Sequence, residues 1–520
     1  MWLIRKLVSI TLANYMLDKK MKEEEFFKAL KEEKRKIVFI GDLNYLDLNN
    51  GYSFISSYTA NSWLIEKNEK SKRIFDASKK GLILYYEDCL EIGLDLISNL
   101  YQEGMIGISG SEELFSDMFE FNISCNQRKN EKLSLFILHI TNECNLRCKY
   151  CFADAGKISK KTRRLELRDI ENIVKIIKNT HKELIDDSFA IEFNSGEIFC
   201  NKKILLEGIR LIKSYFADDE RYVGIPIQTN GTIYSPSVSK ILKKYHLGLS
   251  VSYDGPKEVH DRNRIFGNSF GSHDIVLKNM KKYSEDGIIV GALATATNPK
   301  DIPSVYEDFL SLTNIICGFK INPVYICGRQ ENFQNRDFFY KEMANEYVKC
   351  FDKFIHEDIK KYAFLDPFSD MIFYLKSILY YENPFMCRTF PCGAGKNQLT
   401  FGYDGNIYPC QEFLSNKTFI IDKIDNLDSL NTIPEKVKSM NLSNRTLPEE
   451  CKKCAFLNFC GNACVAHCYN ANKDVNSKIP ECEYIKTIFE YFIKLLSEND
   501  QGLMNFIKKY VTRNKNMESK

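Results

Sequence analysis

The sequence has no apolar run that approaches the length of a membrane-spanning helix. It also has almost no excess of one charge, since 72 Lys and Arg face 69 Asp and Glu for a net charge of +3. Such a balance gives no general attraction to nucleic acid or to a membrane surface. Internal repeats and low-complexity segments are absent as well. We therefore expect a globular protein that has neither nucleic acid nor membrane as a partner.

The first residues lack the features of a secretion signal. Residues 1–16 are apolar with one early basic pair, but no small-residue cleavage site follows them. The strongly charged stretch 16–36 comes directly afterwards. We interpret the segment as an amphipathic N-terminal helix and expect a cytoplasmic protein.

Cysteine is what this chain has in abundance, with 18 residues. Disulfides do not persist in a reducing cytoplasm, so dense cysteine groups there favour metal sites or catalysis. One group lies around residue 148 and a second lies between residues 387 and 482. Isolated cysteines are usually small buried hydrophobes, and we assign no role to the scattered ones. These are Cys89, Cys125, Cys200, Cys317, Cys327, Cys350 and Cys468.

Residues 131–330 alternate short apolar runs with amphipathic segments. The apolar runs predict strands at 133–141, 188–196, 225–231, 248–255, 288–297 and 319–325. Near-continuous apolar strands separated by helices indicate a parallel sheet covered by helices. We predict an α/β fold with a partial (β/α)6 TIM-like barrel, whose active site lies at the C-terminal ends of the strands.

The rest of the chain is too long to be part of the same domain. Strands at 36–48, 52–59 and 61–67 and an amphipathic helix at 87–106 suggest a winged-helix-like module. The region after residue 387 is rich in cysteine and poor in long apolar runs, so metal sites are needed to stabilise it. The predicted domains are 1–130 (N-terminal module), 131–330 (barrel), 331–386 (helical bridge), 387–490 (small Cys-rich iron–sulfur domain) and 491–520 (terminal helix and tail).

Cys144, Cys148 and Cys151 form a CxxxCxxC motif directly after the first predicted strand. Three thiolates on one loop suit an iron–sulfur cluster, and three ligands leave one iron of a four-iron cluster open. An open iron can bind a substrate or a cofactor. A structural zinc site is the alternative, but zinc needs a fourth ligand, and the nearest histidine, His139, lies within the preceding strand.

This motif, with the aromatic residues Tyr150 and Phe152 beside its third cysteine, resembles that of the radical SAM superfamily. The resemblance implies that the open iron chelates the amino and carboxylate groups of S-adenosylmethionine (SAM). One-electron reduction then splits the sulfonium and releases a 5′-deoxyadenosyl radical, so the cofactor carries the difficult chemistry and the protein orients it.

Polar motifs end the next three strands in the order that the family shows. The second strand ends in Asn194-Ser195-Gly196-Glu197, where the family usually has Gly-Gly-Glu-Pro, so Ser195 and Ile198 depart from the pattern. QTNGT ends the third strand and SVSYDGPKEVHDRNR ends the fourth. Each motif alone would be a turn or a helix cap. The resemblance implies SAM contacts by Phe152, by Gly196 and Glu197 at the amino group, by Ser252 and Asp254 at the ribose, and by Arg264 at the carboxylate.

The second cysteine group contains a pattern of seven cysteines: Cys392, Cys410, Cys451, Cys454, Cys460, Cys464 and Cys482. This pattern resembles the SPASM extension of radical SAM maturases, with zinc-ribbon sites as the alternative. The resemblance implies two auxiliary [4Fe–4S] clusters, hence three in total. The nearer cluster would use Cys387, Cys392, Cys410 and Cys464, and the outer one Cys451, Cys454, Cys460 and Cys482. Cys387 lies upstream of the pattern; without it, the nearer cluster has an open iron for a substrate thiolate.

The same resemblance implies a peptide or protein substrate and a flavodoxin- or ferredoxin-type electron donor. The N-terminal module resembles precursor-recognition elements, which bind a leader peptide as an added strand. Dimerisation or packing is the alternative role for this module. We predict a maturase that modifies a ribosomally made, Cys-rich peptide by thioether or carbon–carbon crosslinks.

Two other functions remain open. Sulfatase maturases of this type carry an acidic residue, acting as a base, directly after the cysteine that corresponds to Cys410, where this chain has Gln411. Glu412 is therefore the candidate catalytic base, displaced by one residue. A non-catalytic iron–sulfur electron carrier is the other alternative, but it would not need the SAM-binding motifs.

Overall fold

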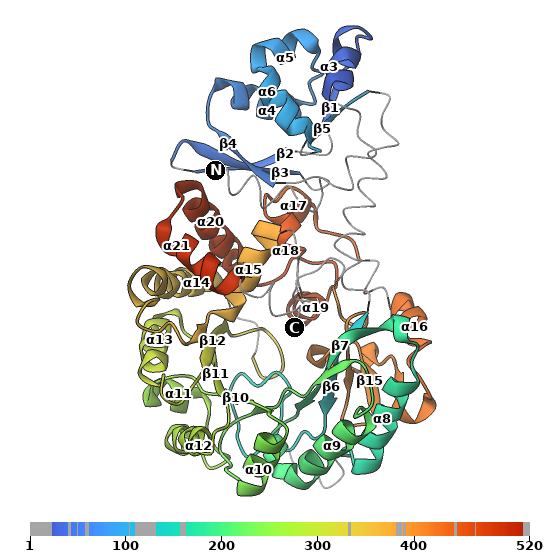
Figure 1. The fold of residues 1–520 in the computed structure, drawn as a ribbon, viewed down its shortest axis with the longest axis vertical. Coiled ribbons are helices and arrows are strands. Elements are labelled where there is room, and N and C mark those ends of the chain that lie inside the picture. The colour runs from blue at the N-terminus through green and yellow to red at the C-terminus, as the bar shows by residue number, and fades with distance from the viewer. Residues whose placement is uncertain are drawn as a thin grey trace.

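The computed structural model describes residues 23–512 except 40–42, 49, 58–61, 103, 110–131, 157–162, 331–333, 381–386, 388–391, 441, 443–444 and 463. The helix predicted for residues 1–16 lies outside the described residues. No helix in the described ranges combines the length and the apolar character needed to cross a bilayer. In Figure 1 the N-terminal unit lies at the top, the barrel at the bottom and the C-terminal helices between them.

The six predicted parallel strands are present, close to their predicted positions. They are β6 (Leu133–His139), β7 (Ile185–Asn194), β8 (Tyr222–Gly224) continued by β9 (Gln228–Thr229), β10 (Leu249–Ser252), β11 (Val290–Ala296) and β12 (Gly318–Pro323). The third strand is split at Pro226, which has no N–H to donate to a ladder. Its first half, β8, pairs with β7, and its second half, β9, pairs with β10. The barrel wall therefore consists of two open sheets that meet at this strand, and they do not close.

Amphipathic helices cover the outside of these sheets (Figure 1). They are α8 (Leu167–Asn179), α9 (Lys202–Tyr215), α10 (Pro236–Lys244), α11 (Lys257–Asn263), α12 (His273–Glu285) and α13 (Ile302–Ser311). In α8, Ile170, Ile173 and Ile177 recur at helical spacing and are fully buried. Each such side chain contributes about 1.5–3 kcal/mol on burial, which fixes the helices against the strands.

Strands from outside the predicted barrel extend both sheets. In the Cys-rich region, β14 (Gln398–Phe401) pairs in parallel with β6, and β15 (Asn406–Tyr408) and β16 (Asp422–Lys423) follow it. At the other edge, β13 (Asp366–Pro367) pairs with β12. The sequence analysis did not anticipate these pairings. They attach the Cys-rich region directly to the barrel sheet, beside the strand that precedes Cys144.

Helices of the predicted bridge pack against the C-terminal helices. The bridge helices are α14 (Arg336–Lys353) and α15 (Ser369–Tyr380), and the C-terminal helices are α20 (Cys482–Glu498) and α21 (Gln501–Phe506). The Phe351 ring lies 5.5 Å from that of Phe492 and 4.9 Å from that of Phe506. The predicted domain boundary at residue 490 falls inside α20, so the terminal helix belongs to the same unit as Cys482. Short helices fill the Cys-rich region: α16 (Ile433–Ser439), α17 (Glu449–Lys452), α18 (Leu457–Cys460) and α19 (Val465–Asn472).

The N-terminal unit has its own hydrophobic core. It contains α3 (Glu23–Lys31), β1 (Ile37–Phe39), β2 (Leu43–Asp47), β3 (Tyr52–Ser57), β4 (Ser62–Glu66), α4 (Glu69–Lys80), α5 (Tyr86–Ile92), α6 (Leu94–Gln102) and β5 (Ile106–Ile108). The strands form two separate sheets, β2-β3-β4 and β1-β5. Gly93, with φ of +112°, breaks the predicted helix 87–106 into α5 and α6. The winged-helix arrangement is therefore not confirmed.

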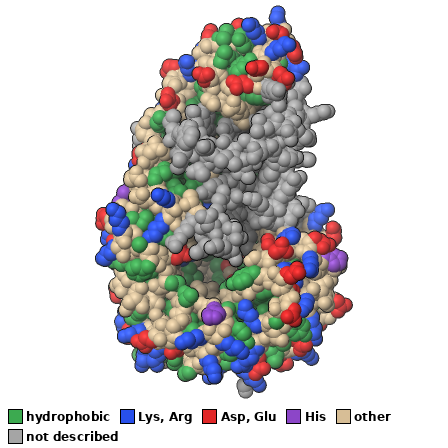
Figure 2. Space-filling model, viewed as in Figure 1, with side chains coloured by type: hydrophobic (Ala, Val, Ile, Leu, Met, Phe, Trp, Pro, Cys, Tyr) green, Lys and Arg blue, Asp and Glu red, His purple; other side chains and the backbone are tan. Residues whose placement is uncertain are grey.

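The sheet β2-β3-β4 packs against the Cys-rich region. The Phe54 ring lies 6.2 Å from that of Phe456 and 5.9 Å from that of Phe459. The Ser56 hydroxyl donates a 2.7 Å hydrogen bond to the Ala455 carbonyl oxygen. These contacts fall between Cys454 and Cys460, so the N-terminal unit rests on the outer cysteine group. On the face in Figure 2, acidic and basic side chains intermingle over the described surface.

Candidate active site

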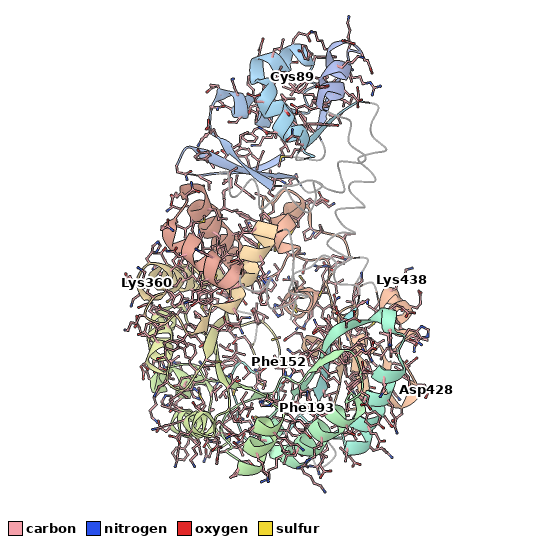
Figure 3. The ribbon with its side chains drawn as sticks, viewed as in Figure 1. Cys89, Phe152, Phe193, Lys360, Asp428 and Lys438 are labelled. Atoms are coloured by element: carbon pink, nitrogen blue, oxygen red, sulfur yellow. The ribbon has the colours of Figure 1, made fainter. Side chains whose placement is uncertain are left out.

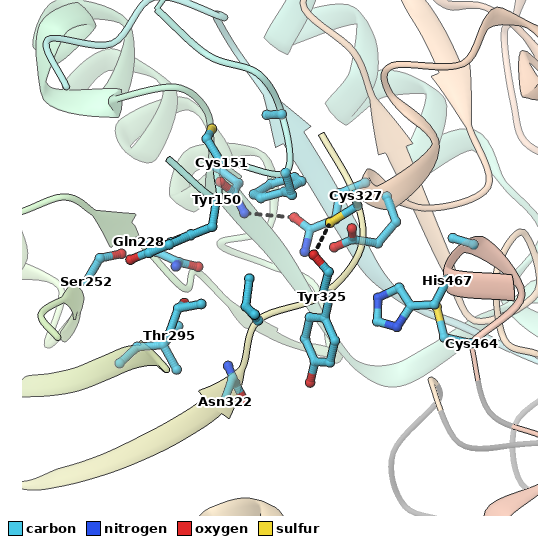
Figure 4. Close-up of a pocket in the computed structure, with 18 of the residues that line it drawn as sticks. Tyr150, Cys151, Gln228, Ser252, Thr295, Asn322, Tyr325, Cys327, Cys464 and His467 are labelled. Atoms are coloured by element: carbon cyan, nitrogen blue, oxygen red, sulfur yellow. Dashed lines mark hydrogen bonds between the residues drawn. The ribbon is translucent and has the colours of Figure 1, made fainter. Parts of the chain in front are cut away.

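A cavity of about 410 Å³ lies where the C-terminal ends of the barrel strands meet the Cys-rich region. Both predicted cysteine groups reach this space, which we call the central cavity. Its cysteines are Cys144, Cys148, Cys151, Cys327, Cys387, Cys392, Cys410 and Cys464. Figure 4 shows Cys151 and Cys464 on opposite sides of it. The structure thus brings together two groups that are far apart in the sequence.

The loop that carries the CxxxCxxC motif is held by the end of β7. The Gly196 and Glu197 N–H groups donate 2.8 Å hydrogen bonds to the carbonyl oxygens of Thr141 and Glu143. A Cβ on residue 196 would lie 2.3 Å from the Glu143 carbonyl oxygen. Glycine is therefore required at this position because two backbones approach closely.

Each thiol of this motif faces at least one N–H donor. The Leu146 N–H lies 3.3 Å from Cys144 Sγ, the Ala155 N–H 3.4 Å from Cys151 Sγ, and Arg264 Nη1 3.9 Å from Cys148 Sγ. Burial raises the pKa of the Cys144 thiol to about 12 and also raises that of Cys148. Such thiols lose their protons when a metal binds, and N–H donors to sulfur then stabilise the thiolates. The donor set fits an iron–sulfur cluster.

A second loop, which follows β12, also holds the CxxxCxxC loop in place. Gly328 has φ of +59°, and the Arg329 N–H donates a 3.0 Å hydrogen bond to the Cys151 carbonyl oxygen. The Arg329 guanidinium donates to Asp154 Oδ1 and to the Cys148 carbonyl oxygen, both at 2.8 Å. Figure 3 places the neighbouring Phe152 inside the barrel, and Phe152 also lines the central cavity; its predicted contact with SAM stays a prediction.

Asp254 is buried and its carboxylate is fully engaged. Its Oδ2 accepts a 2.5 Å hydrogen bond from the Tyr150 hydroxyl and lies 3.1 Å from Arg264 Nε. Its Oδ1 accepts a 3.0 Å hydrogen bond from the Thr295 N–H. Asp254 is not among the residues that line the central cavity, whereas Ser252 and Arg264 are. In this structure the carboxylate contacts Tyr150 and Arg264, and the predicted ribose contact by Asp254 stays a prediction.

Glu197 likewise turns away from the cavity. Its oxygens accept hydrogen bonds from the Phe199 N–H (2.9 Å), the Thr229 hydroxyl (2.7 Å) and the Asn230 N–H (2.6 Å). These bonds tie the end of β7 to the end of β9, and the predicted contact with an amino group stays a prediction. Ser195, where the family usually has glycine, does line the cavity. Its buried hydroxyl has no hydrogen-bond partner among the described residues, which fits a polar ligand there.

Four thiols of the Cys-rich region gather on the opposite wall. Burial, together with the neighbouring thiols of Cys464 and Cys392, raises the pKa of the Cys387 thiol to about 12. Burial and the same neighbours hold the pKa of Cys410 well above its ordinary value. Cys387 therefore lies with the other three candidate ligands of the nearer auxiliary cluster.

The outer four cysteines line a separate pocket of about 70 Å³. They are Cys451, Cys454, Cys460 and Cys482, and Lys478 and Lys486 line the pocket with them. Two cations suit the negative charge of a cluster held by four thiolates. The donor set of this pocket therefore also fits an iron–sulfur cluster.

Further polar residues line the cavity beside Cys410. His467 Nδ1 lies 3.1 Å from Glu481 Oε1, and the His467 ring lies 4.4 Å from that of Tyr325. Burial opposes the charged form of His467, but Cys464 and Glu481 outweigh burial and raise its pKa. Glu412, the candidate base, lines the same wall, and burial raises its pKa. No sequence motif pointed to Tyr325, His467 or Glu481.

The alternation along β12 was a signal that the sequence analysis overlooked. Lys320 and Asn322 are two residues apart, so they point to the same side of the strand. Both line the central cavity. Gln411 also lines the cavity, and it accepts a 2.8 Å hydrogen bond from the Asn194 amide, which joins the Cys-rich region to the end of β7.

Sequence profiles of known families match both halves of this site. The profile of the radical SAM superfamily matches residues 138–302, and that of SPASM, an iron–sulfur cluster-binding domain, matches residues 392–455. The chain therefore contains a radical SAM domain and an SPASM domain. This result confirms the resemblance seen in the cysteine motifs and favours iron–sulfur clusters over the zinc alternative.

Curated relatives agree with this assignment. A cysteine-type anaerobic sulfatase-maturating enzyme of Clostridium perfringens is 24% identical over 374 residues, which are 69% of this chain and 96% of the relative. The radical SAM cyclopropyl synthase TigE of Paramaledivibacter caminithermalis is 26% identical over 253 residues, 44% of this chain and 52% of the relative. A solved structure described as native anSMEcpe with bound AdoMet matches with a TM-score of 0.57 and 21% identity, over 70% of this chain and 97% of that chain. The structural match establishes the fold.

Proposed function

We propose that this radical SAM/SPASM protein is a maturase that forms thioether or carbon–carbon crosslinks in a ribosomally made, Cys-rich peptide. The observation that supports this proposal is that both cysteine groups line the central cavity. Its volume of about 410 Å³ lies in the range of small-ligand sites, about 300–1,000 Å³. A substrate side chain would therefore lie between the SAM-binding cluster and the nearer auxiliary cluster.

The chain offers ligands for three clusters. Cys144, Cys148 and Cys151 would hold the SAM-binding cluster, and the two sets of four cysteines described above would hold the auxiliary clusters. When bound, the first cluster and SAM supply a radical that removes a hydrogen atom from the substrate. With Cys387 as a fourth ligand, the nearer auxiliary cluster is fully ligated, which suits electron transfer.

The polar residues of the barrel would bind and orient SAM. Arg264 lines the cavity, and its guanidinium suits a planar carboxylate. The Ser195 and Ser252 hydroxyls line the same space and suit the amino group and the ribose. The hydrogen bonds of Glu197 and Asp254 also hold the loops that carry these groups.

Glu412 is our candidate for the base that takes up the proton released when the crosslink closes. Its carboxylate lies in the central cavity near His467, whose charge opposes the effect of burial on the pKa of Glu412. A base in a buried site with a tunable pKa is a common catalytic arrangement. Replacement by Gln removes the base while preserving shape, so E412Q should release 5′-deoxyadenosine but form no product.

The N-terminal unit is our candidate for binding the leader peptide. In the described part of its three-stranded sheet, β2 and β4 are edge strands, and an edge strand can accept an added peptide strand. Packing against the outer cysteine group is the competing role, and the contacts of Phe54 are compatible with both. A flavodoxin- or ferredoxin-type electron donor and a cytoplasmic location remain predictions.

The first test is anaerobic incubation of cluster-reconstituted protein with dithionite and SAM. The wild type should release 5′-deoxyadenosine, and Cys144→Ala should release none. Cys317→Ala is the matched control, since Cys317 is exposed and lies before β12, at the end away from the cavity. Absence of release from the wild type would refute the enzyme proposal and leave the electron-carrier alternative.

The second test uses a short Cys-rich peptide encoded beside this gene. Crosslinking should remove two hydrogen atoms per bond, which mass spectrometry detects. An unchanged peptide mass, with 5′-deoxyadenosine still released, would argue against crosslinking of that peptide.

Sulfatase maturation is the second candidate function, favoured by the relative that this chain matches over 96% of its length. Gln411 weakens it, because an amide cannot take the proton that the acidic residue of such enzymes takes. The test is formylglycine formation on a Cys- or Ser-containing sulfatase peptide. Product formed by the wild type and lost in E412Q would favour this function over crosslinking.

A further inference from the structure

Asn230, which follows β9, presents a side-chain N–H to a cysteine of the CxxxCxxC motif. Its Nδ2 donates to Cys144 Sγ at 3.6 Å, and the residue lines the central cavity although only 7% of it is exposed. The Leu146 N–H donates to the same sulfur from within the cysteine loop. Asn230 therefore adds a donor to Cys144 from a different strand end, and the sequence analysis used its QTNGT motif only as the end of a strand.

Neighbouring groups fix the orientation of the Asn230 amide. Its Oδ1 accepts a 3.0 Å hydrogen bond from the Thr232 N–H and a 2.7 Å hydrogen bond from the Thr232 hydroxyl. Its Nδ2 also donates a 2.9 Å hydrogen bond to Asn145 Oδ1. A flipped amide would place its oxygen against Asn145 Oδ1 and an N–H against the Thr232 N–H. The network therefore holds Nδ2, not Oδ1, toward the sulfur.

The backbone that carries Asn230 is fixed as well. The buried Glu197 carboxylate accepts a 2.6 Å hydrogen bond from the Asn230 N–H. Gly231 has φ of +73°, and a Cβ there would lie 2.7 Å from Val251 Cγ1. Asn279 in α12 donates a 3.0 Å hydrogen bond to the Gly231 carbonyl oxygen. The amide donor is thus held at a defined distance from Cys144 by groups that are themselves buried.

We propose that Asn230 sets the reduction potential of the SAM-binding cluster through its N–H···S hydrogen bond to Cys144. This inference rests on the proposed function, in which Cys144, Cys148 and Cys151 hold that cluster. Reduction adds one electron, supplied by dithionite in vitro or by a donor protein, and no covalent bond forms or breaks. The thiolates share the added negative charge, so a donor to sulfur stabilises the reduced form more than the oxidised form. Asn230 therefore raises the potential and makes the cluster easier to reduce.

Asn230→Ser removes this donor with little change to the loop. A serine side chain is too short to reach the sulfur, but its hydroxyl can still accept a hydrogen bond from the N–H two residues further on. Cluster-reconstituted protein is titrated with dithionite under anaerobic conditions without SAM, and the reduced clusters are followed by EPR. The signal that is absent from Cys144→Ala belongs to the SAM-binding cluster. At the potential that reduces half of this cluster in the wild type, its ratio of reduced to oxidised form should fall about tenfold in Asn230→Ser.

Asn279→Ser is the matched control. It makes the same substitution at another buried asparagine and removes the bond to the Gly231 carbonyl oxygen, but it removes no donor to sulfur. Its ratio should equal that of the wild type, and the auxiliary-cluster signals should not change in either variant. An equal fall in Asn279→Ser and Asn230→Ser overturns the inference, because support of the loop then explains the effect.

The remaining outcomes separate this inference from the proposed function. The same ratio in wild type and Asn230→Ser overturns the role of Asn230 alone. If Asn230→Ser does not retain its iron, Asn230→Ala removes the same donor and should show the same fall; loss of iron from both variants also overturns the inference, since the role is then structural. A wild type without any signal that depends on Cys144 overturns the proposed function as well.

Discussion

Gly328→Ala isolates the effect of a close approach between two loops of the active site. A Cβ on residue 328 would lie 2.2 Å from the Cys151 carbonyl oxygen and 2.3 Å from that of Phe152. Real Cβ atoms essentially never come closer than 3.0 Å, so one of the two backbones must move by about 0.8 Å. Both contacts are to backbone atoms of the CxxxCxxC loop, which has no flexible side-chain end that could give way.

The expected loss follows from this displacement. A misplacement of about 1 Å at a catalytic centre can cost about 100-fold in rate, so we expect a loss of that order in 5′-deoxyadenosine release. The left-handed backbone at residue 328 adds a strain of about 1–2 kcal/mol. Iron content should fall as well, because the displaced loop carries Cys151.

Gly81→Ala is the matched control. Gly81 has the same φ of +59°, but a Cβ there meets nothing within 4 Å. This variant therefore has the same backbone strain without the clash, and it should keep the wild-type rate and iron content. If Gly328→Ala matches Gly81→Ala in both measurements, the argument from close approach is wrong.

Three further changes test other parts of the structure. Tyr150→Phe removes the 2.5 Å hydrogen bond to the buried Asp254 and should lower the free energy of unfolding by about 1.5–3 kcal/mol. The Tm should fall accordingly, and an unchanged Tm would contradict this prediction. Cys451→Ala should remove about a third of the iron while 5′-deoxyadenosine release continues; wild-type iron content would count against an outer cluster. Phe54→Ala removes ring contacts with Phe456 and Phe459 and should lower the free energy of unfolding by about 3–5 kcal/mol. The N-terminal unit should therefore become more sensitive to limited proteolysis. Tyr222→Ala is the control and should not have this effect, because the Tyr222 side chain is 71% exposed.

Local patterns in the sequence were sufficient to predict most of the barrel strands. Buried parallel strands are recognisable because they form short, near-continuous apolar runs, and all six appear close to their predicted positions. Weak local patterns failed: the helix predicted at 87–106 breaks at Gly93, and the strands of the N-terminal unit divide between two sheets. Pairing of strands from distant parts of the chain, such as β14 with β6, leaves no periodic signal in either segment.

The sequence by itself was enough to identify the cysteine motifs and their order along the strands, because the covalent chain alone sets the spacing of ligands within one loop. Only the tertiary structure decided which polar groups reach the cavity. Glu197 and Asp254 match the family pattern, yet both turn inward because backbone N–H groups and buried hydroxyls need acceptors there. Cys327, Glu412, His467 and Glu481 meet on one wall although they come from separate segments, since packing of the Cys-rich region onto the barrel brings them together.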